Sequence, residues 1–294
     1  MASLRLATRS SPQARTQAQG VADAIVAATG CDAELVFVDT SGDRRQDVPI
    51  HVIGGQGVFV KEVQQAVLDG RADVAVHSAK DLPSLPHEGL EIGAFMARRD
   101  AADALIGRPL RALAEGATVA SGSVRRRAQL AAVRPDLSFA ELRGNIATRL
   151  SKVPDGGSIL MAVAALQVLG QTDLIAERLD PAMFVPAVGQ GCVAVEARVG
   201  DAPTAELLAA VDDAVTRHQV EVERSFLAEL GSGCSLPVGA HVAGPTLHTF
   251  LAATDDLSAD EVAVARDTVL LAFDGSDHEA ARRAARAARA AVGW

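Results

Sequence analysis

The chain has 294 residues, of which 49% are hydrophobic, and it carries a formal net charge of −9. This length predicts two or three domains and allows a sizeable core. Aromatic residues make up only 3% of the chain and tyrosine is absent. An acidic protein with so few stacking side chains is not expected to bind DNA or RNA in general.

The three cysteines are Cys31, Cys192 and Cys234. Their odd number and wide spacing argue against both a disulfide framework and a zinc site, so we expect no metal. The first residues begin a strand-like pattern without the apolar core of a signal peptide. No apolar run is long enough to cross a bilayer. We therefore expect a cytoplasmic protein with reduced thiols and no membrane partner.

The first 95 residues alternate between strand and helix signals. Strands are predicted over 4–7, 35–38 and 74–78. Helices are predicted from Ser11, an N-cap followed by proline, to about residue 28, and again over 60–67. The glycine-rich segment 41–57 between them is expected to be a mobile loop.

The same alternation restarts near residue 118 and gives way to another pattern in the last third. Predicted strands over 118–120, 137–142 and 158–162 precede predicted helices over 124–133, 145–152 and 166–169. This order favours α/β blocks built on parallel strands. A helix over 213–230, strands over 238–242, 246–252 and 262–273, and an amphipathic helix over 280–292 follow. They predict a separate α+β domain with an antiparallel sheet.

The most informative segment is the predicted strand 74–78 together with the residues that follow it. Four polar residues crowd its end, namely His77, Ser78, Lys80 and Asp81, before Pro83 stops regular structure. In open α/β sheets, ligands bind beyond the carboxyl ends of strands. Taken alone, this cluster fits catalytic chemistry and an ordinary solvated turn equally well.

Positive charge gathers over 121–152, where seven basic residues face two acidic ones, a local net charge of +5. Helix N-termini, serine hydroxyls and arginine guanidinium groups can together bind carboxylates or phosphates. Neither a P-loop nor a dinucleotide fingerprint occurs, so a carboxylate ligand is favoured. We expect Arg127 and Arg134 to form ordinary surface ion pairs. Five other arginines are expected to contact ligand: Arg9, Arg125, Arg126, Arg143 and Arg149.

The loop over 231–237 carries Cys234 between glycines and a proline, directly after the predicted long helix. A thiol on such a loop can be accessible and nucleophilic. A free cysteine is also often a small buried apolar residue, and position alone does not separate the two interpretations. Cys31 and Cys192 lie in helix-end and strand contexts and are expected to be packing residues.

Seven motifs in one order resemble the porphobilinogen deaminase (hydroxymethylbilane synthase) family, and they span nearly the whole chain. They are Ala-Thr-Arg-Ser-Ser-Pro at 7–12, Phe-Val-Lys-Glu at 59–62, Val-His-Ser-Ala-Lys-Asp-Leu-Pro at 76–83, Leu-Arg-Gly-Asn at 142–145, Thr-Arg-Leu-Ser-Lys at 148–152, Pro-Ala-Val-Gly-Gln-Gly at 186–191 and Gly-Cys-Ser-Leu-Pro-Val-Gly at 233–239. The resemblance implies a transferase of porphyrin and heme biosynthesis. Such an enzyme joins four porphobilinogen molecules head to tail and releases ammonia at each step.

The resemblance also implies the fold. It predicts two doubly wound α/β domains like type II periplasmic binding proteins and a small C-terminal α+β domain with a three-stranded antiparallel sheet. Residues 1–96 with 191–210 would form the first domain, 102–186 the second and 213–294 the third. The family resemblance favours a monomer.

Roles carried over from the family fall on matching positions. Asp81 matches the catalytic aspartate, and Cys234 matches the cysteine that holds a dipyrromethane cofactor through a thioether. Residues implied to bind the cofactor are Lys80, Ser123, Arg125, Arg126 and Arg149, and we add Ser78 to them. Residues implied to bind substrate are Arg9, Ser11, Arg143 and Gln190. His77 is expected to be structural.

Three positions depart from the family by lacking an expected basic residue: Ser41, Gln56 and Val168. Substrate affinity or contacts to the growing chain are expected to differ there. Activity is expected to persist, because Asp81, Cys234 and the main arginine set remain. The alternatives are a family member that binds the cofactor without turnover and a non-enzymatic module that binds small anions.

Overall fold

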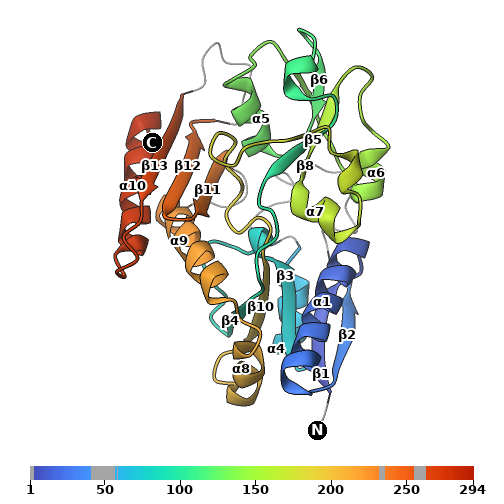
Figure 1. The fold of residues 1–294 in the computed structure, drawn as a ribbon. Helices are drawn as coiled ribbons and strands as arrows, with labels where there is room; N and C mark the ends of the chain where they lie inside the picture. Colours follow the sequence, from blue (N-terminus) through green and yellow to red (C-terminus); the bar gives the residue numbers. More distant parts are fainter. Residues whose placement is uncertain (1–2, 41–56, 58, 232–235, 255–262) are drawn as a thin grey trace. The chain divides into compact units, whose positions relative to one another are not determined.

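The computed structural model describes residues 3–40, 57, 59–231, 236–254 and 263–294 (Figure 1). Most of the predicted loop over 41–57 and Cys234 lie outside the described residues. The chain divides into two compact units, one of residues 1–99 with 191–218 and one of residues 100–190 with 219–294. The predicted division into three domains stays a prediction.

The first unit is built on a five-stranded sheet in the order β2-β1-β3-β10-β4. Its strands are β1 (Leu4–Arg9), β2 (Ala33–Val38), β3 (Val74–Ser78), β4 (Leu90–Phe95) and β10 (Val193–Arg198). Strand β1 pairs in parallel with β2 and β3, whereas the return strand β10 runs antiparallel to β3 and β4. The parallel half follows the predicted βα order, and the antiparallel half comes from the chain returning after residue 191.

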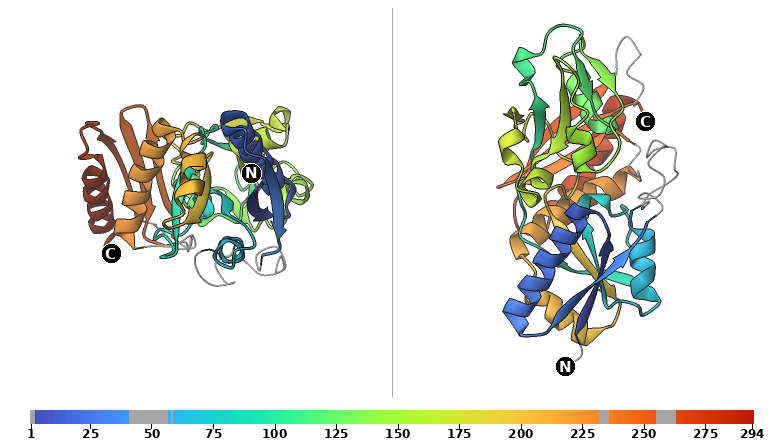
Figure 2. Two further views of the ribbon diagram at one scale, coloured as in Figure 1. Left: turned by 90° about the horizontal axis from the view of Figure 1, so that it is seen from below. Right: turned by 90° about the vertical axis from the view of Figure 1, so that its right-hand side faces the viewer.

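Helices cover both faces of this sheet: α1 (Pro12–Thr29), α4 (Lys61–Leu68) and α8 (Ala202–Ala209). Successive residues of a strand point to opposite faces, and β1 illustrates this. Leu6 packs in a cluster with α1 and α8, and its neighbour Ala7 packs with α4. Figure 2 (right) shows α1 and α4 on opposite sides of the strands. Because helices cover both faces, side chains of this sheet that could contact a ligand are expected at the strand ends.

The second unit contains a five-stranded sheet in the order β7-β6-β8-β5-β9. The strands are β5 (Asp103–Gly107), β6 (Thr118–Ala120), β7 (Ser138–Ala140), β8 (Ser158–Ala162) and β9 (Glu177–Arg178). Strand β6 is parallel to β7 and β8, while β5 is antiparallel to β8 and β9. The helices that follow β6, β7 and β8 are α5 (Val124–Ala131), α6 (Ile146–Leu150) and α7 (Val163–Val168).

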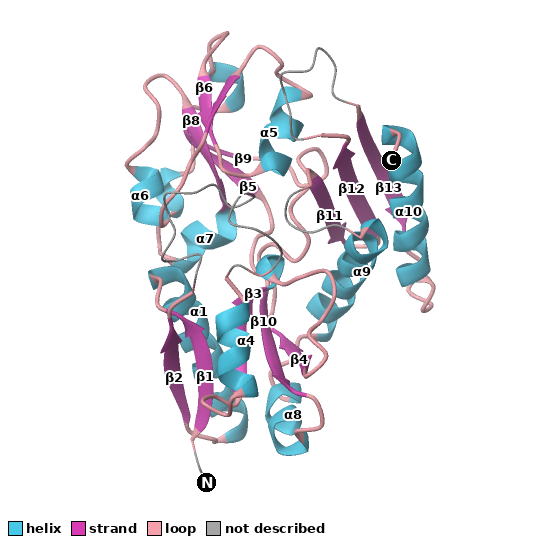
Figure 3. Cartoon of the chain, turned by 180° about the vertical axis from the view of Figure 1, so that it is seen from behind, coloured by secondary structure: helices cyan, strands magenta, loops and turns pink. Residues whose placement is uncertain are grey.

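The same unit contains a three-stranded antiparallel sheet of β11 (Val238–Ala243), β12 (Thr246–Ala252) and β13 (Val264–Leu270). Helices α9 (Ala214–Leu230) and α10 (Asp277–Val292) accompany it (Figure 3). Phe226 of α9, Leu247 of β12 and Ala285 of α10 share one buried core. On the other side of α10, Arg286 pairs with Glu279 and Glu229. The predicted amphipathic helix and the predicted fold class are confirmed.

Among the α-helices and strands of the described residues, five were not predicted: β4, β5, β9, β10 and α8. Strand β5 begins at Asp103 and β10 contains Glu196, and both residues are buried. A charged residue interrupts the apolar run that identifies a strand. Within the described residues, none of the helices combines the length and apolar character needed to span a membrane.

Candidate active site

The carboxyl end of β3 leads directly into a short 3-10 turn, η1 (Ala79–Asp81). The Ala79 N–H donates to the Cys192 carbonyl at 2.9 Å, and the Leu82 N–H donates to the Ala79 carbonyl at 3.2 Å. These bonds fix the turn at both ends, and Lys80 and Asp81 are half-buried on it. The ionisable pair therefore lies beyond a strand end, where α/β sheets bind ligands.

Neighbouring strand ends of the first unit carry three more predicted site residues. Ser78 donates from Oγ to Gln17 Oε1 of α1 at 3.1 Å. Ser11 caps α1, its Oγ accepting from the Ala14 N–H at 3.4 Å. Arg9 ends β1, and its guanidinium carbon lies 4.1 Å from the centroid of the Phe59 ring, a cation–π contact. Because β1 and β3 are parallel neighbours, their carboxyl ends lie at one edge of the sheet.

His77 points to the face of the sheet that α4 covers. Its Nε2 lies 3.1 Å from Oε2 of Glu196, and both side chains are buried. Gln64 of α4 donates from Nε2 to both oxygens of the same carboxylate, at 3.1 and 2.9 Å. This packing agrees with the structural role expected of His77. Glu196 was missed, although a charged residue within the apolar run 193–197 is a signal for a buried pair.

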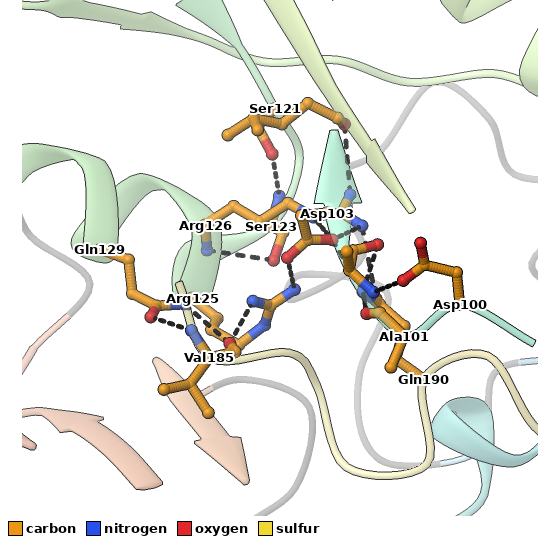
Figure 4. Close-up of polar contacts among 12 residues, drawn as sticks. Asp100, Ala101, Asp103, Ser121, Ser123, Arg125, Arg126, Gln129, Val185 and Gln190 are labelled. Atoms are coloured by element: carbon orange, nitrogen blue, oxygen red, sulfur yellow. Dashed lines mark hydrogen bonds and ion pairs between the residues drawn. The ribbon is translucent and has the colours of Figure 1, made fainter. Parts of the chain in front are cut away.

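In the second unit, Arg125 and Arg126 share one carboxylate, that of Asp103 (Figure 4). Arg125 Nη2 lies 2.8 Å from Oδ2, and Arg126 places Nη2 at 2.7 Å and Nε at 2.9 Å from Oδ1. The exposed fractions are 0% for Asp103, 4% for Arg125 and 7% for Arg126. Asp103 was not predicted as a site residue.

The charges of this cluster determine how Asp103 ionises. Burial alone would raise the pKa of Asp103, but the charges of Arg125 and Arg126 and the hydrogen bonds from Arg126 and Gln190 outweigh it and lower that pKa to about 2. Asp103 is therefore ionised at neutral pH. Two guanidinium groups against one carboxylate leave the trio with a formal net charge of +1. A buried positive excess of this kind suits an anionic group of a ligand.

The β6–α5 turn explains why these arginines lie where they do. Ser123 caps α5, with its Oγ accepting from the Arg126 N–H at 3.4 Å, and Ser121 Oγ accepts from the Ser123 N–H at 3.2 Å. A Cβ at Gly122 would come within 2.8 Å of the Leu142 carbonyl oxygen, so glycine lets this turn approach the one after β7. Arg125 and Arg126 thus occupy the first turn of a capped helix.

Gln190 completes the cluster from a segment 87 residues away from Asp103. Its Nε2 donates to Asp103 Oδ1 at 2.8 Å and to the Ala101 carbonyl at 2.7 Å. Its Oε1 accepts from Arg126 Nη2 at 3.5 Å. Gln190 is 1% exposed. The structure therefore groups Ser123, Arg125, Arg126 and Gln190 around a carboxylate that the sequence analysis did not single out.

Arg143 and Arg149 lie on the β7–α6 connection of the same unit. Arg149 donates from Nε to the Gly144 carbonyl at 2.8 Å, and Lys152 Nζ donates to the Arg143 carbonyl at 3.3 Å. Asn145 caps α6, its Oδ1 accepting from the Thr148 N–H at 3.0 Å. Both arginines are half-buried. This turn is the neighbour of the one that carries Ser123, because β6 and β7 are parallel partners.

The two arginines assigned to ordinary ion pairs do form them. Arg127 Nη1 lies 2.8 Å from Glu141 Oε1, and Arg134 Nη2 lies 2.6 Å from Asp136 Oδ2. Cys31 and Cys192 are buried, as expected of packing residues. Val168 ends α7 and is half-buried. Ser41, Gln56 and Cys234 lie outside the described residues.

Comparison with known proteins gives one consistent result. Residues 4–206 match the family model described as porphobilinogen deaminase, dipyromethane cofactor binding domain. Porphobilinogen deaminase from Acidithiobacillus ferrooxidans is 47% identical over 244 residues, covering 81% of this chain and 80% of the relative. The enzyme from Acidothermus cellulolyticus is 46% identical over 246 residues, covering 81% and 74%.

A solved periplasmic substrate-binding protein of an ABC transporter from Coxiella burnetii is 12% identical to the chain, with a TM-score of 0.44, covering 73% of this chain and 94% of that one. The family model spans more than half of the chain, and the relatives from Acidithiobacillus and Acidothermus cover about four fifths of it. The chain therefore belongs to the porphobilinogen deaminase family.

Proposed function

We propose that this chain is a hydroxymethylbilane synthase in which Asp81 is the catalytic carboxylate and the Arg125–Arg126 pair binds carboxylates of the tetrapyrrole. The reaction is a transferase reaction of tetrapyrrole biosynthesis. Four porphobilinogen molecules condense head to tail, each releasing ammonia, to give linear hydroxymethylbilane. The observation that carries the site assignment is the buried arginine pair, whose charge exceeds that of Asp103.

The chemistry of the donor set fits a dipyrromethane cofactor. When bound, this group supplies the pyrrole chain to which substrate units are added and through which the product stays attached to the protein. Each ring carries carboxylate arms, and guanidinium, ammonium and hydroxyl groups are the donors that bind them. We assign the covalent thioether to Cys234 and the polar contacts to Ser78, Lys80, Ser123, Arg125, Arg126 and Arg149.

Asp81 supplies the one carboxylate in this proposal that acts on the reacting groups. Its place on the turn after β3 leaves it half-buried beside Lys80. A carboxylate near the pyrrole nitrogens of the substrate stabilises the positive charge that develops there, and it can accept and return a proton. The neighbouring ammonium of Lys80 is suited to bind the carboxylate arms, and it is not suited to stabilise the positive charge at the pyrrole nitrogens.

The remaining residues bind the incoming substrate. Arg9 and Ser11 follow β1, Arg143 follows β7, and Gln190 bonds Asp103. Porphobilinogen brings an acetate and a propionate, so the growing polymer gains carboxylates at each step. Basic residues at several strand ends of an otherwise acidic protein are suited to bind these carboxylates. We expect a cytoplasmic monomer whose partner is the small substrate rather than nucleic acid or membrane.

The test is incubation of the purified chain with porphobilinogen, following porphobilinogen loss, ammonia release and hydroxymethylbilane formation. All three are expected, with one ammonia for each porphobilinogen consumed. A chain that gains a covalent adduct without turnover would be an impaired family member. A chain that keeps its bare mass and consumes no porphobilinogen would be a binding module, and the proposal would be wrong.

A further inference from the structure

A buried carboxylate outside the catalytic set lies on α9. Glu223 is 0% exposed. Its Oε2 accepts from the Gly189 N–H at 2.8 Å, and its Oε1 accepts from the Val242 N–H of β11 at 2.8 Å. His241 Nδ1 lies 3.3 Å from the same Oε1. One side chain therefore joins α9, β11 and the segment that precedes β10.

The bond to Gly189 leads to the arginine pair. Gly189 precedes Gln190, whose Nε2 donates to Asp103 Oδ1 at 2.8 Å. Asp103 in turn pairs with Arg125 and Arg126 at 2.8 and 2.7 Å. Each link in this series is buried. The orientation of Gln190, and through it of the Asp103 carboxylate, depends on where the backbone at residue 189 is held.

We infer that Glu223 is a positioning residue, which holds the 189–190 backbone so that Gln190 keeps Asp103 and the arginine pair in place for a ligand carboxylate. The inference about the ligand rests on the proposed function, whereas the coupling from Glu223 to Gln190 does not. Charge-assisted bonds from two backbone N–H groups make this carboxylate hard to replace. A glutamine of the same shape would turn an amide donor toward at least one of those N–H groups or weaken both bonds.

The variant that tests this is Glu223→Gln, and the matched control is Glu229→Gln on the same helix. Glu229 pairs with Arg286 and lies outside the cluster. Glu223→Gln is expected to raise the KM for porphobilinogen about tenfold with a smaller change in kcat, the size expected for losing a hydrogen bond to a charged group. Glu229→Gln should leave KM and kcat within about twofold of the wild-type values. Equal kinetics in the two variants would overturn the inference.

A double-mutant cycle with Gln190→Ala separates positioning from general loosening of the fold. If Glu223 acts through Gln190, the double variant should have a KM no higher than the worse of the two single variants. If the KM of the double variant rises by the product of the two single-variant increases, the residues act independently and the inference is wrong. Should Glu223→Gln fail to fold, Glu223→Asp keeps the charge with a shorter reach and enters the same cycle.

Hydrogen exchange gives a measurement that needs no turnover. Peptides covering 186–191 and 100–104 should exchange faster in Glu223→Gln than in the wild type, while Glu229→Gln should match the wild type. Unchanged exchange in both peptides would overturn the coupling. A wild type that consumes no porphobilinogen would instead refute the proposed function, and the exchange result would still decide the role of Glu223.

Discussion

His77 and Glu196 meet on neighbouring strands of the first sheet, with 3.1 Å between His77 Nε2 and Glu196 Oε2, and both are buried. One residue separates His77 from Ala79, where the turn that carries Lys80 and Asp81 begins. Gln64 donates two further bonds to the carboxylate. The strand end that leads to Lys80 and Asp81 is thus anchored from β10 and α4 together.

Glu196→Ala should lower the free energy of unfolding by about 3 kcal/mol, because it leaves Gln64 buried without its acceptor and His77 buried without the neighbouring carboxylate. Urea denaturation measures this. Glu91→Ala is the control, since Glu91 is an exposed residue of the adjacent strand β4 and should change stability by less than about 0.5 kcal/mol. Equal losses in the two variants would show that the buried contact contributes nothing.

The stability of the second unit should depend on pH through Asp103. Its pKa falls from an ordinary 3.8 to about 2 in the folded chain. A lowered pKa contributes stability that is fully present above the unfolded value and is lost as the pH falls through the folded value. The contribution is about 2 kcal/mol, because one pKa unit corresponds to about 1.4 kcal/mol.

The measurement compares the wild type with Asp103→Asn in denaturant titrations from pH 7 to pH 2. The stability difference between them should stay constant from pH 7 to pH 5. It should narrow by about 2 kcal/mol by pH 2, where Asp103 is about half protonated in the folded chain and almost fully protonated in the unfolded chain. A difference that stays constant over the whole range would contradict the ion-paired state of Asp103.

Gly239→Ala should destabilise the chain and disturb the arginine site. A Cβ at residue 239 would lie 2.8 Å from the Val185 carbonyl oxygen, which accepts from Arg125 Nη1 at 2.6 Å and Gln129 Nε2 at 2.9 Å. We expect a loss of about 1–3 kcal/mol, the usual effect of overpacking. Gly20→Ala, in open space on α1, should instead stabilise by about 0.5–1 kcal/mol. Thermal unfolding compares the two, and a neutral Gly239→Ala would refute the close approach.

Asp81→Ala should leave cofactor attachment possible but stop elongation, lowering kcat by about 100-fold or more, as expected for loss of an acid–base group. The assay follows hydroxymethylbilane formation by variants whose intact mass shows the adduct. Asp69→Ala, which removes an exposed carboxylate of the same unit, should keep wild-type kcat. Normal turnover in Asp81→Ala would remove Asp81 from the catalytic role.

Local sequence patterns predicted several strands in which an uninterrupted apolar run ended in turn residues. Strands over 74–78, 118–120, 158–162 and 246–252 have the predicted bounds. The patterns failed at strands that contain a buried charge, as in β5 with Asp103 and β10 with Glu196. Periodicity counts such residues as exposed, because their partners lie elsewhere in the chain.

The candidate site was predictable only in part for the same reason. The basic segment 121–152 and the family resemblance pointed to Arg125 and Arg126, and the motif at 186–191 contains Gln190, yet Asp103 and Glu223 lie in neither the basic segment nor any of the seven motifs. Asp103 meets Gln190 across 87 residues, and Glu223 meets Gly189 across 34. Contacts of this separation are set by the fold, so no local spacing encodes them. For Asp103, an acidic residue within the apolar run 101–106 is a signal of a buried partner. Glu223 lies among mostly polar and charged neighbours on α9, so its sequence context carries no such signal.

The central claim is that the chain holds a covalent pyrrole cofactor through Cys234, and intact-mass measurement after incubation with porphobilinogen tests it most directly. The wild type and Cys31→Ala, a buried cysteine variant used as control, should each carry one dipyrromethane adduct, while Cys234→Ala should keep the bare chain mass. A wild type at its bare mass, or an adduct of the same size on Cys234→Ala, would contradict the account.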